Sequence, residues 1–143
     1  KTSMQSQART FERTRTDHSR ETAEDYVELI LRLESSGLES VRNVDLVNAL
    51  GVAQPTVTKA LDRLRAEGLV ESGDRRQVLL TPEGRELAEA SLARHKLVVK
   101  FLMHIGVSLA QAEMDAEGIE HHVSEVTLTA MRAFLAGYES KQP

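Results

Sequence analysis

The chain has 143 residues, of which 41% are hydrophobic, and it carries a formal net charge of −4 at pH 7. This length fits one domain or two small ones, and no apolar run approaches the roughly 20 residues of a membrane-spanning helix. The sequence has no cysteine, which excludes disulfides, cysteine-based zinc sites and thiol nucleophiles, so a metal site must use Asp, Glu or His. Because the start also lacks the apolar segment of a secretory signal, we expect a cytoplasmic protein.

The first part of the sequence predicts a flexible basic arm followed by a helix. Residues 1–20 contain five Lys or Arg and only two acidic residues. Residues 1–19 are rich in Ser, Thr, Gln and Arg and have no sustained apolar face, so we expect partial helix there at most. The first well-supported helix covers about residues 20–36, where apolar side chains recur at helical spacing and Gly37 follows the last turn.

The next segment predicts two helices separated by a glycine turn. Asn43 is placed to cap a short helix that ends at Leu50, and Gly51 is expected to stop it. A second helix is expected over about residues 54–67. Pro55 suits its first turn, where the missing N–H would be unpaired in any case.

A hairpin is expected directly after these helices. Two short strands, 69–72 and 77–81, are joined by a polar tip at 73–76. The order helix, short helix, turn, helix and hairpin is that of a winged helix–turn–helix. The remaining sequence predicts three further helices: one from Thr81 and Pro82 to about residue 104, one starting after Ser108, and one from Ser124 to about Tyr138.

The second helix of the predicted helix–turn–helix has residues suited to the DNA major groove. Its first turn needs short or amide side chains, and Gln can bond an adenine edge while Thr can contact a thymine methyl group. Basic residues later in the helix and at the hairpin tip suit phosphates or the minor groove. The predicted DNA-contacting residues are Gln54, Pro55, Thr56, Thr58, Lys59, Arg63, Arg75 and Arg76. Two alternatives stay open: a winged helix that contacts protein, and ordinary capping or solvated residues at these positions.

The stretch from Glu117 to His122, Glu-Gly-Ile-Glu-His-His, is the densest in metal-capable side chains. On a helix, Glu117, Glu120 and His121 have the spacing i, i+3 and i+4 and share one face. Taken alone, the stretch is also compatible with a solvated acidic turn beside an exposed histidine pair. His122 lies on a different side and is left out of the predicted site.

Two other segments add candidate donors. Asp25 and Glu28 have i, i+3 spacing on the first helix, and His95 lies among apolar residues of the long helix, where a packed histidine is the alternative. Carboxylates with some imidazole suit Mn(II) and Fe(II) and can also take Zn(II) or Co(II). A structural zinc site is expected to use thiolates, and Ca(II) rarely takes imidazole.

The sequence resembles the manganese-responsive branch of the DtxR-like metalloregulators over roughly residues 20–136. The segments that carry the resemblance are AEDYVELI, NALGVAQPTVTKALDRLRAEGLV, LTPEG, ARHKLVVKFLMHIGV and DAEGIEHHVSE. The resemblance implies a homodimer of winged-helix domains joined to a helical dimerisation domain, with a metal site of one or two ions per subunit. It also implies the metal ligands, which are Asp25, Glu28, His95, Glu117, Glu120 and His121. Iron-type relatives have sulfur ligands at the positions of Asp25 and Glu120, which favours the manganese branch.

We therefore predict a mainly α protein with a flexible basic arm (1–19), a winged helix–turn–helix DNA-binding domain (20–81) and a helical metal-binding and dimerisation domain (82–143). The predicted function is that of a Mn(II)-activated repressor of metal-uptake genes, bound to a palindromic double-stranded operator. Alternatives are a metal-independent or Fe(II)-responsive winged-helix repressor. A metal-dependent hydrolase is disfavoured because the sequence has neither a Ser/His/Asp order nor a glycine-rich phosphate loop.

Overall fold

The computed structural model describes residues 4–141, with the backbone alone at residues 10, 11 and 13–17. The chain divides into two compact units, residues 1–89 and 90–143, and the division falls within the long helix α4 (Pro82–His104). Helices predominate, as predicted, and the described strands form one small sheet. Within residues 4–141, no helix combines the length and the apolar character needed to cross a membrane.

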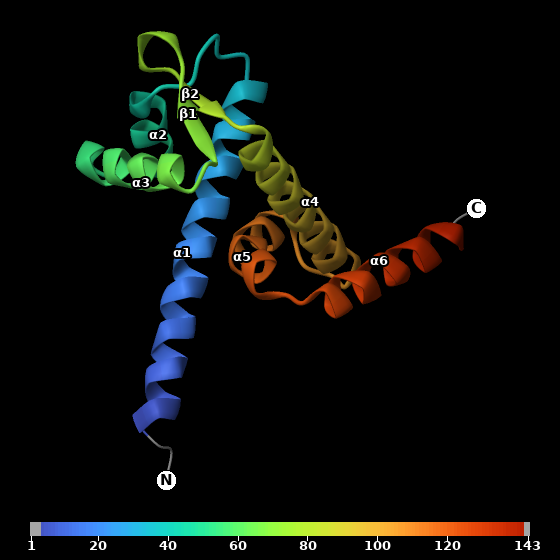
Figure 1. The fold of residues 1–143 in the computed structure, drawn as a ribbon. Coiled ribbons are helices and arrows are strands. Elements are labelled where there is room, and N and C mark those ends of the chain that lie inside the picture. Colours follow the sequence, from blue (N-terminus) through green and yellow to red (C-terminus); the bar gives the residue numbers. More distant parts are fainter. Residues whose placement is uncertain (1–3, 142–143) are drawn as a thin grey trace. The chain divides into compact units, whose positions relative to one another are not determined.

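The first helix is longer than predicted. α1 covers Met4–Ser35, so the prediction that this helix starts near residue 20 was wrong. Figure 1 shows its N-terminal half projecting beyond the other elements of the first unit. The segment has neither Gly nor Pro, and extending an existing helix costs far less free energy than nucleating a new one. The helix therefore continues back from residue 20 although no apolar face accompanies it.

The helix–turn–helix is formed by α2 (Asn43–Leu50) and α3 (Gln54–Ala66), close to the predicted bounds. Gly51 ends α2 in the left-handed conformation, with φ 66°. The predicted cap at Asn43 was wrong. Arg42 precedes the first turn, and its backbone N–H donates to the Asp45 carboxylate at 2.9 Å. The Asn43 amide instead donates to the Thr58 hydroxyl at 3.4 Å and so joins α2 to α3.

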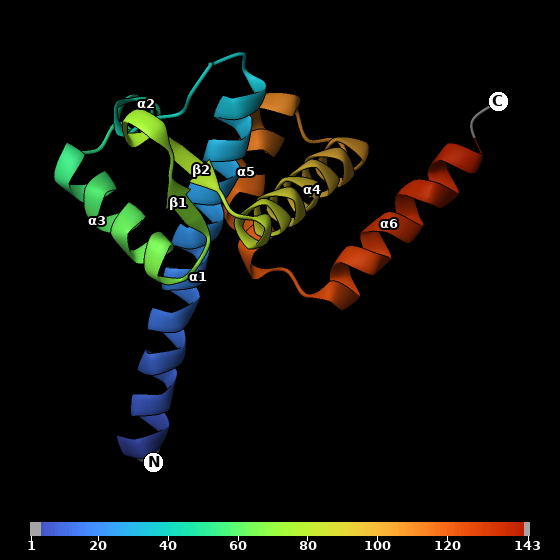
Figure 2. The same cartoon turned by 45° about the horizontal axis from the view of Figure 1, so that its top comes forward.

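The wing is an antiparallel hairpin of β1 (Val70–Ser72) and β2 (Val78–Leu80), with Val70 opposite Leu80. β1 packs against α3 and β2 against α1, as Figure 2 shows. A tight turn at Asp74–Arg76 joins the strands. The core of this unit combines α1, α2, α3, the hairpin and the start of α4, and its fully buried side chains include Val27, Ile30, Leu46, Val57 and Leu61.

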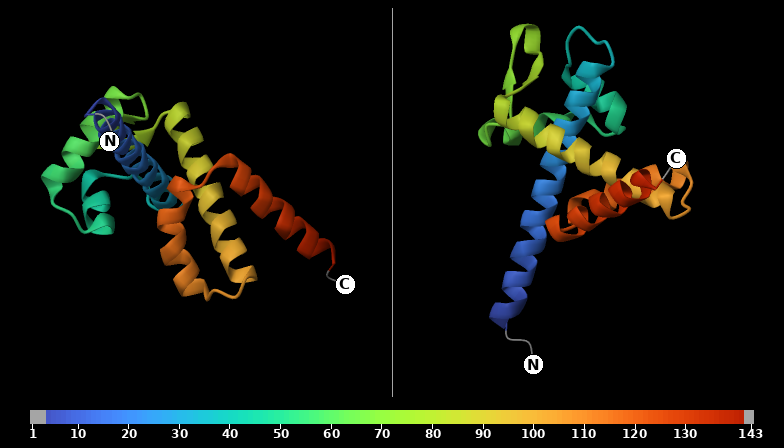
Figure 3. Two further views of the ribbon diagram at one scale, coloured as in Figure 1. Left: turned by 90° about the horizontal axis from the view of Figure 1, so that it is seen from below. Right: turned by 90° about the vertical axis from the view of Figure 1, so that its right-hand side faces the viewer.

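The second unit contains the C-terminal part of α4, α5 (Leu109–His122) and α6 (Glu125–Ser140). Ser108 and Ser124 cap α5 and α6, as predicted, each accepting a hydrogen bond from the backbone N–H three residues later. α5 folds back along α4, as Figure 3 shows. Its small residues Ala112 and Ala116 are fully buried in the core with Val98 of α4, which allows the two helices to approach closely.

Candidate metal centre and nucleic-acid interface

One face of α5 carries four metal-capable side chains. Glu113, Glu117, Glu120 and His121 follow the spacing i, i+4, i+7 and i+8, which places them along one side of a helix. His95 of α4 meets this face because the apolar residues that follow it on α4 pack against the alanines of α5. Packing in the helical core therefore sets the position of the polar cluster beside it.

His95 contacts three of these carboxylates. Its Nδ1 lies 2.7 Å from Glu120 Oε2 and 3.6 Å from Glu117 Oε1. Its Nε2 lies 2.6 Å from Glu113 Oε2. His95, Glu117 and Glu120 each offer a ligand atom, and these atoms lie within 4.8 Å of one another. Three of the predicted ligands, from two helices, thus lie together.

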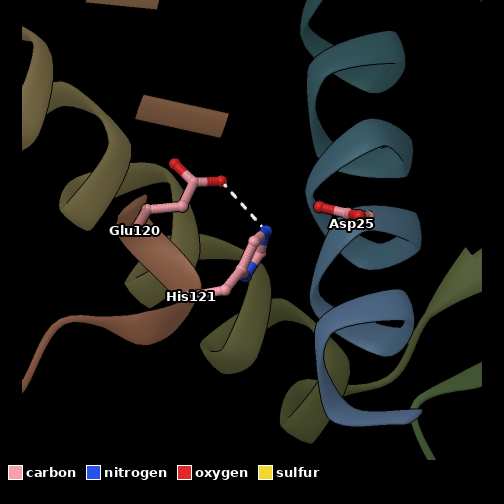
Figure 4. Close-up of side chains that lie close together, drawn as sticks. All are labelled: Asp25, Glu120 and His121. Atoms are coloured by element: carbon pink, nitrogen blue, oxygen red, sulfur yellow. Dashed lines mark ion pairs between the residues drawn. The ribbon is translucent and has the colours of Figure 1, made fainter. Parts of the chain in front are cut away.

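Glu120 is the centre of the cluster. It is 1% exposed, and its two oxygens reach two imidazoles: Oε2 contacts His95, and Oε1 lies 3.3 Å from His121 Nε2. Figure 4 shows the Glu120–His121 pair on α5. A buried carboxylate is costly unless cations or hydrogen-bond donors surround it. A carboxylate buried among imidazoles and further carboxylates is the donor chemistry that suits Mn(II) or Fe(II), so these residues fit a divalent ion.

The carboxylates also change the acidity of His95. Burial lowers the pKa of His95, but the hydrogen bond to Glu113 and the charges of Glu120 and Glu117 raise it, and the net pKa lies above its ordinary value. Without metal, stability contributed by protonated His95 is therefore present below about pH 6.5 and is lost as the pH rises through the raised pKa. A bound metal ion must displace this proton, so metal binding has the opposite pH dependence.

We expect Mn(II) affinity to fall as the pH is lowered through the raised pKa of His95, by up to about tenfold per pH unit for one displaced proton. Isothermal titration calorimetry at a series of pH values measures this dependence. His122→Gln removes an exposed histidine of the same helix and should keep the slope. A Mn(II) affinity that is constant across this range would contradict the coupling of metal binding to the His95 proton.

The remaining two predicted ligands, Asp25 and Glu28, lie one turn apart on α1 in the first unit. Asp25 is half-buried, whereas Glu28 is buried and lies 3.5 Å from the Arg32 guanidinium. Both carboxylates lie on adjacent turns of one helix, and their role as ligands belongs to the proposal below.

Glu113 is the contact that the sequence prediction missed. Its spacing of four residues from Glu117 places it on the same face of α5, so helical periodicity continued one turn toward the N-terminus would have included it. The prediction began from the densest stretch, at residue 117, and did not extend the face backward. The close contact with His95 Nε2 shows that this position belongs to the cluster.

The predicted DNA-contacting residues of α3 all lie on its exposed side, opposite the buried Val57, Leu61 and Leu64. Gln54, Pro55, Thr58, Lys59 and Asp62 line a shallow hollow on this side, and the Asp62 carboxylate pairs with Arg65. The other four side chains are short, amide or basic, and this surface is accessible to a nucleic-acid groove. The predicted DNA-contacting residues of α3 are Gln54, Pro55, Thr56, Thr58, Lys59 and Arg63.

The three predicted arginines lie away from the first turn of α3, and their surroundings differ from one another. Arg63 lies 3.3 Å from Glu67 and also contacts the Ser19 hydroxyl of α1, so its guanidinium has partners within the protein. Arg75 and Arg76 are exposed at the tip of the wing, in the left-handed region with φ of 54° and 62°. Arginine adopts this region rarely, and here it directs two adjacent cations outward from a tight turn.

Comparisons with known proteins agree with this arrangement. The family model of the iron dependent repressor N-terminal DNA binding domain matches residues 18–78, and that of the iron dependent repressor metal binding and dimerisation domain matches residues 81–142. The transcriptional regulator MntR of Escherichia coli O157:H7 is 49% identical over 131 residues, which cover 92% of this chain and 84% of the relative. The HTH-type transcriptional regulator MntR of Geobacillus kaustophilus is 38% identical over 71% of each chain.

Solved structures show the same similarity. A manganese-dependent transcriptional repressor in complex with manganese has a TM-score of 0.71 and 30% identity, over 79% of this chain and 52% of that one. The manganese regulator SloR has a TM-score of 0.70 and 30% identity, over 80% and 53%. This chain therefore spans about half the length of these two solved proteins.

Proposed function

Since the chain belongs to the MntR branch of the DtxR-like, iron-dependent repressor family, we propose that it is a repressor activated by Mn(II). Members of this family are metal-dependent, DNA-binding transcriptional regulators and not enzymes, which disfavours the hydrolase alternative. The observation that carries the proposal is the group formed by His95, Glu117 and Glu120, with two of its three side chains buried. Nitrogen and carboxylate donors without sulfur suit Mn(II) and Fe(II), and they can also take Zn(II) or Co(II) by affinity alone.

The proposed ligand set is larger than this group. It adds His121, which pairs with Glu120, and the two carboxylates of α1, and it holds one or two ions per subunit, with Fe(II), Zn(II) and Co(II) as possible substitutes. The full proposed set is Asp25, Glu28, His95, Glu117, Glu120 and His121. When bound, the metal supplies positive charge that offsets the repulsion among four carboxylates.

The ligand set suggests how the metal controls DNA binding. Asp25 and Glu28 belong to the first unit, with α3 and the wing, whereas the other four ligands belong to the second. Ligation by both sets would restrict the first unit and so fix the spacing of the two α3 helices in a homodimer. Linkage then requires that DNA strengthen metal binding by the same factor by which metal strengthens DNA binding.

We further propose that α3 enters the major groove of a palindromic operator and that the wing contacts phosphates or the minor groove. The residues proposed to read bases are Gln54, Thr56 and Thr58, with Pro55 beside them. Lys59 and Arg63 bind DNA phosphates, and Arg75 and Arg76 bind phosphates or the minor groove. Two-fold symmetry of the dimer matches two-fold symmetry of the operator. The proposed location is the cytoplasm, and the proposed targets are metal-uptake genes.

We expect Mn(II) to strengthen operator binding, and EDTA to reverse the effect. Fluorescence anisotropy with a labelled palindromic promoter fragment measures this in parallel titrations with Mn(II), Fe(II), Zn(II) and EDTA. A Glu120→Ala, His121→Ala variant and a fragment of scrambled sequence serve as controls. Equal operator affinity with EDTA and with Mn(II) would contradict metal activation, whereas activation by Fe(II) alone at equal concentration would favour the iron-responsive alternative.

A further inference from the structure

We propose that Glu113 is a positioning residue that orients His95 for metal binding through a hydrogen bond at Nε2. This inference rests on the proposed metal-binding function and adds to it a residue outside the six proposed ligands. The two nitrogens of His95 face different surroundings. Nδ1 lies beside Glu120 and Glu117, whereas the carboxylate at Nε2 is that of Glu113, at 2.6 Å.

The asymmetry indicates which nitrogen would bind the metal. Two carboxylates lie near Nδ1, one of them buried, and together with His95 they form the group of donors within 4.8 Å. Glu113 stands apart from that group, and its side chain is half-exposed at 50%. A divalent ion gains most from the side where two carboxylates converge, so Nδ1 is the nitrogen that faces the metal.

Nε2 must then carry its hydrogen and donate it. An imidazole bound to metal through one nitrogen commonly donates from the other to a carboxylate, which fixes the orientation of the ring and strengthens the donor. Glu113 Oε2 is positioned to accept this bond. The contact joins α4 to α5 one turn before Glu117, so it holds the imidazole plane without occupying a place among the ligands.

Two substitutions separate the hydrogen bond from the charge. Glu113→Ala removes the acceptor and should weaken Mn(II) binding by about 10- to 100-fold, the usual effect of losing such a partner. Glu113→Gln keeps an oxygen acceptor of the same reach and should keep Mn(II) affinity within about threefold of the unmodified protein. The matched control is Asp115→Ala, which removes an exposed carboxylate of the same helix that bonds Gln111 instead. It should leave Mn(II) affinity unchanged.

A second readout excludes a merely structural role. With diamagnetic Zn(II) bound, ¹⁵N NMR of the unmodified protein should show His95 with a protonated Nε2 and a metal-shifted Nδ1, and Glu113→Ala should lose this pattern. The thermal midpoint of the metal-free Glu113→Ala protein should stay close to that of Asp115→Ala. Metal bound through Nε2 would overturn the inference, as would a Glu113→Gln loss as large as that of Glu113→Ala.

The inference and the proposed function fail in different ways. If the unmodified protein does not bind Mn(II), the proposed function fails and the inference with it. If the unmodified protein binds Mn(II) and Glu113→Ala binds it equally well, only the positioning role of Glu113 is overturned.

Discussion

Replacing Glu120 with Gln is expected to abolish the Mn(II)-dependent part of operator binding and to weaken Mn(II) binding by ~100-fold or more, beyond the usual effect of losing a residue that only supports a ligand. Glu120 contacts both His95 and His121 and is 1% exposed. Gln has nearly the same shape but supplies no negative charge and only one oxygen. Calorimetry with Mn(II) and anisotropy with the operator fragment measure the two effects separately.

The control for this variant is Asp115→Asn, which makes the same chemical change at an exposed position of α5 and should leave both affinities unaltered. Circular dichroism of the Glu120→Gln protein checks that its helix content is retained. Undiminished Mn(II) binding in a folded Glu120→Gln protein would show that the buried carboxylate is not a ligand. If Mn(II) binding is weakened but the effect of metal on operator binding is unchanged, the cluster binds metal without controlling DNA binding.

Local sequence signals predicted most of the element bounds because the interactions that end a helix span only one turn. Gly51 and Gly68 stop α2 and α3 in the left-handed conformation. Ser108 and Ser124 each cap a helix by accepting a backbone hydrogen bond. Where the signal was ambiguous, it misled: Asn43 is a common capping residue, but its amide reaches Thr58 on the next helix.

The arm shows the limit of reasoning from apolar periodicity. An apolar face predicts a helix that packs against a core, and residues 4–19 have no such face. Helix formation there depends on continuity with the packed part of α1, where Val27 and Ile30 are fully buried. The prediction treated this segment separately from residues 20–35, and it therefore missed that the segment is helical because it continues a packed helix.

Spacing along one helix predicted part of the candidate metal cluster, and the contact between α4 and α5 determines the rest. The pattern of Glu117, Glu120 and His121 is visible in six consecutive residues, so the sequence sufficed for it. That His95 meets Glu120 depends on how α4 packs on α5, which involves residues 25 positions apart. Glu113 was missed because the predicted face was not continued one turn toward the N-terminus, and its contact with His95 also depends on how α4 packs on α5.

The conformation of the wing tip could not be predicted either. Gly73 and Asp74 favour a turn, and a glycine is the usual residue at a positive φ. The structure instead places Arg75 and Arg76 there. Two arginines held in a disfavoured backbone region are compatible with a turn selected for what its side chains contact, which fits the proposed role of the wing in holding the DNA backbone.

Gly84→Ala is expected to destabilise the first unit by about 3 kcal/mol or more, the upper range for adding a methyl group where nothing can yield. A Cβ at residue 84 would lie 1.9 Å from the Leu69 carbonyl oxygen. That oxygen also accepts the Thr81 backbone N–H at 3.1 Å, while Thr81 caps α4 through the Gly84 N–H at 3.0 Å. The backbone that leaves α3 and enters β1 would therefore have to move away from the start of α4.

Gly137→Ala is the matched control for this close approach. Gly137 lies inside α6, and a Cβ there would meet no heavy atom within 4 Å, so Ala should be neutral or stabilising by about 0.5–1 kcal/mol.

Amide hydrogen exchange of α3 and the hairpin, measured beside exchange in α5 and α6, reports the stability of the two units separately. Loss of protection confined to the first unit in Gly84→Ala would locate the cost at the junction between Leu69 and α4. Protection equal to that of the unmodified protein would contradict the steric argument. Because the same junction supports the wing and the end of α3, the loss should weaken operator binding while Mn(II) binding by the α4–α5 cluster is affected less.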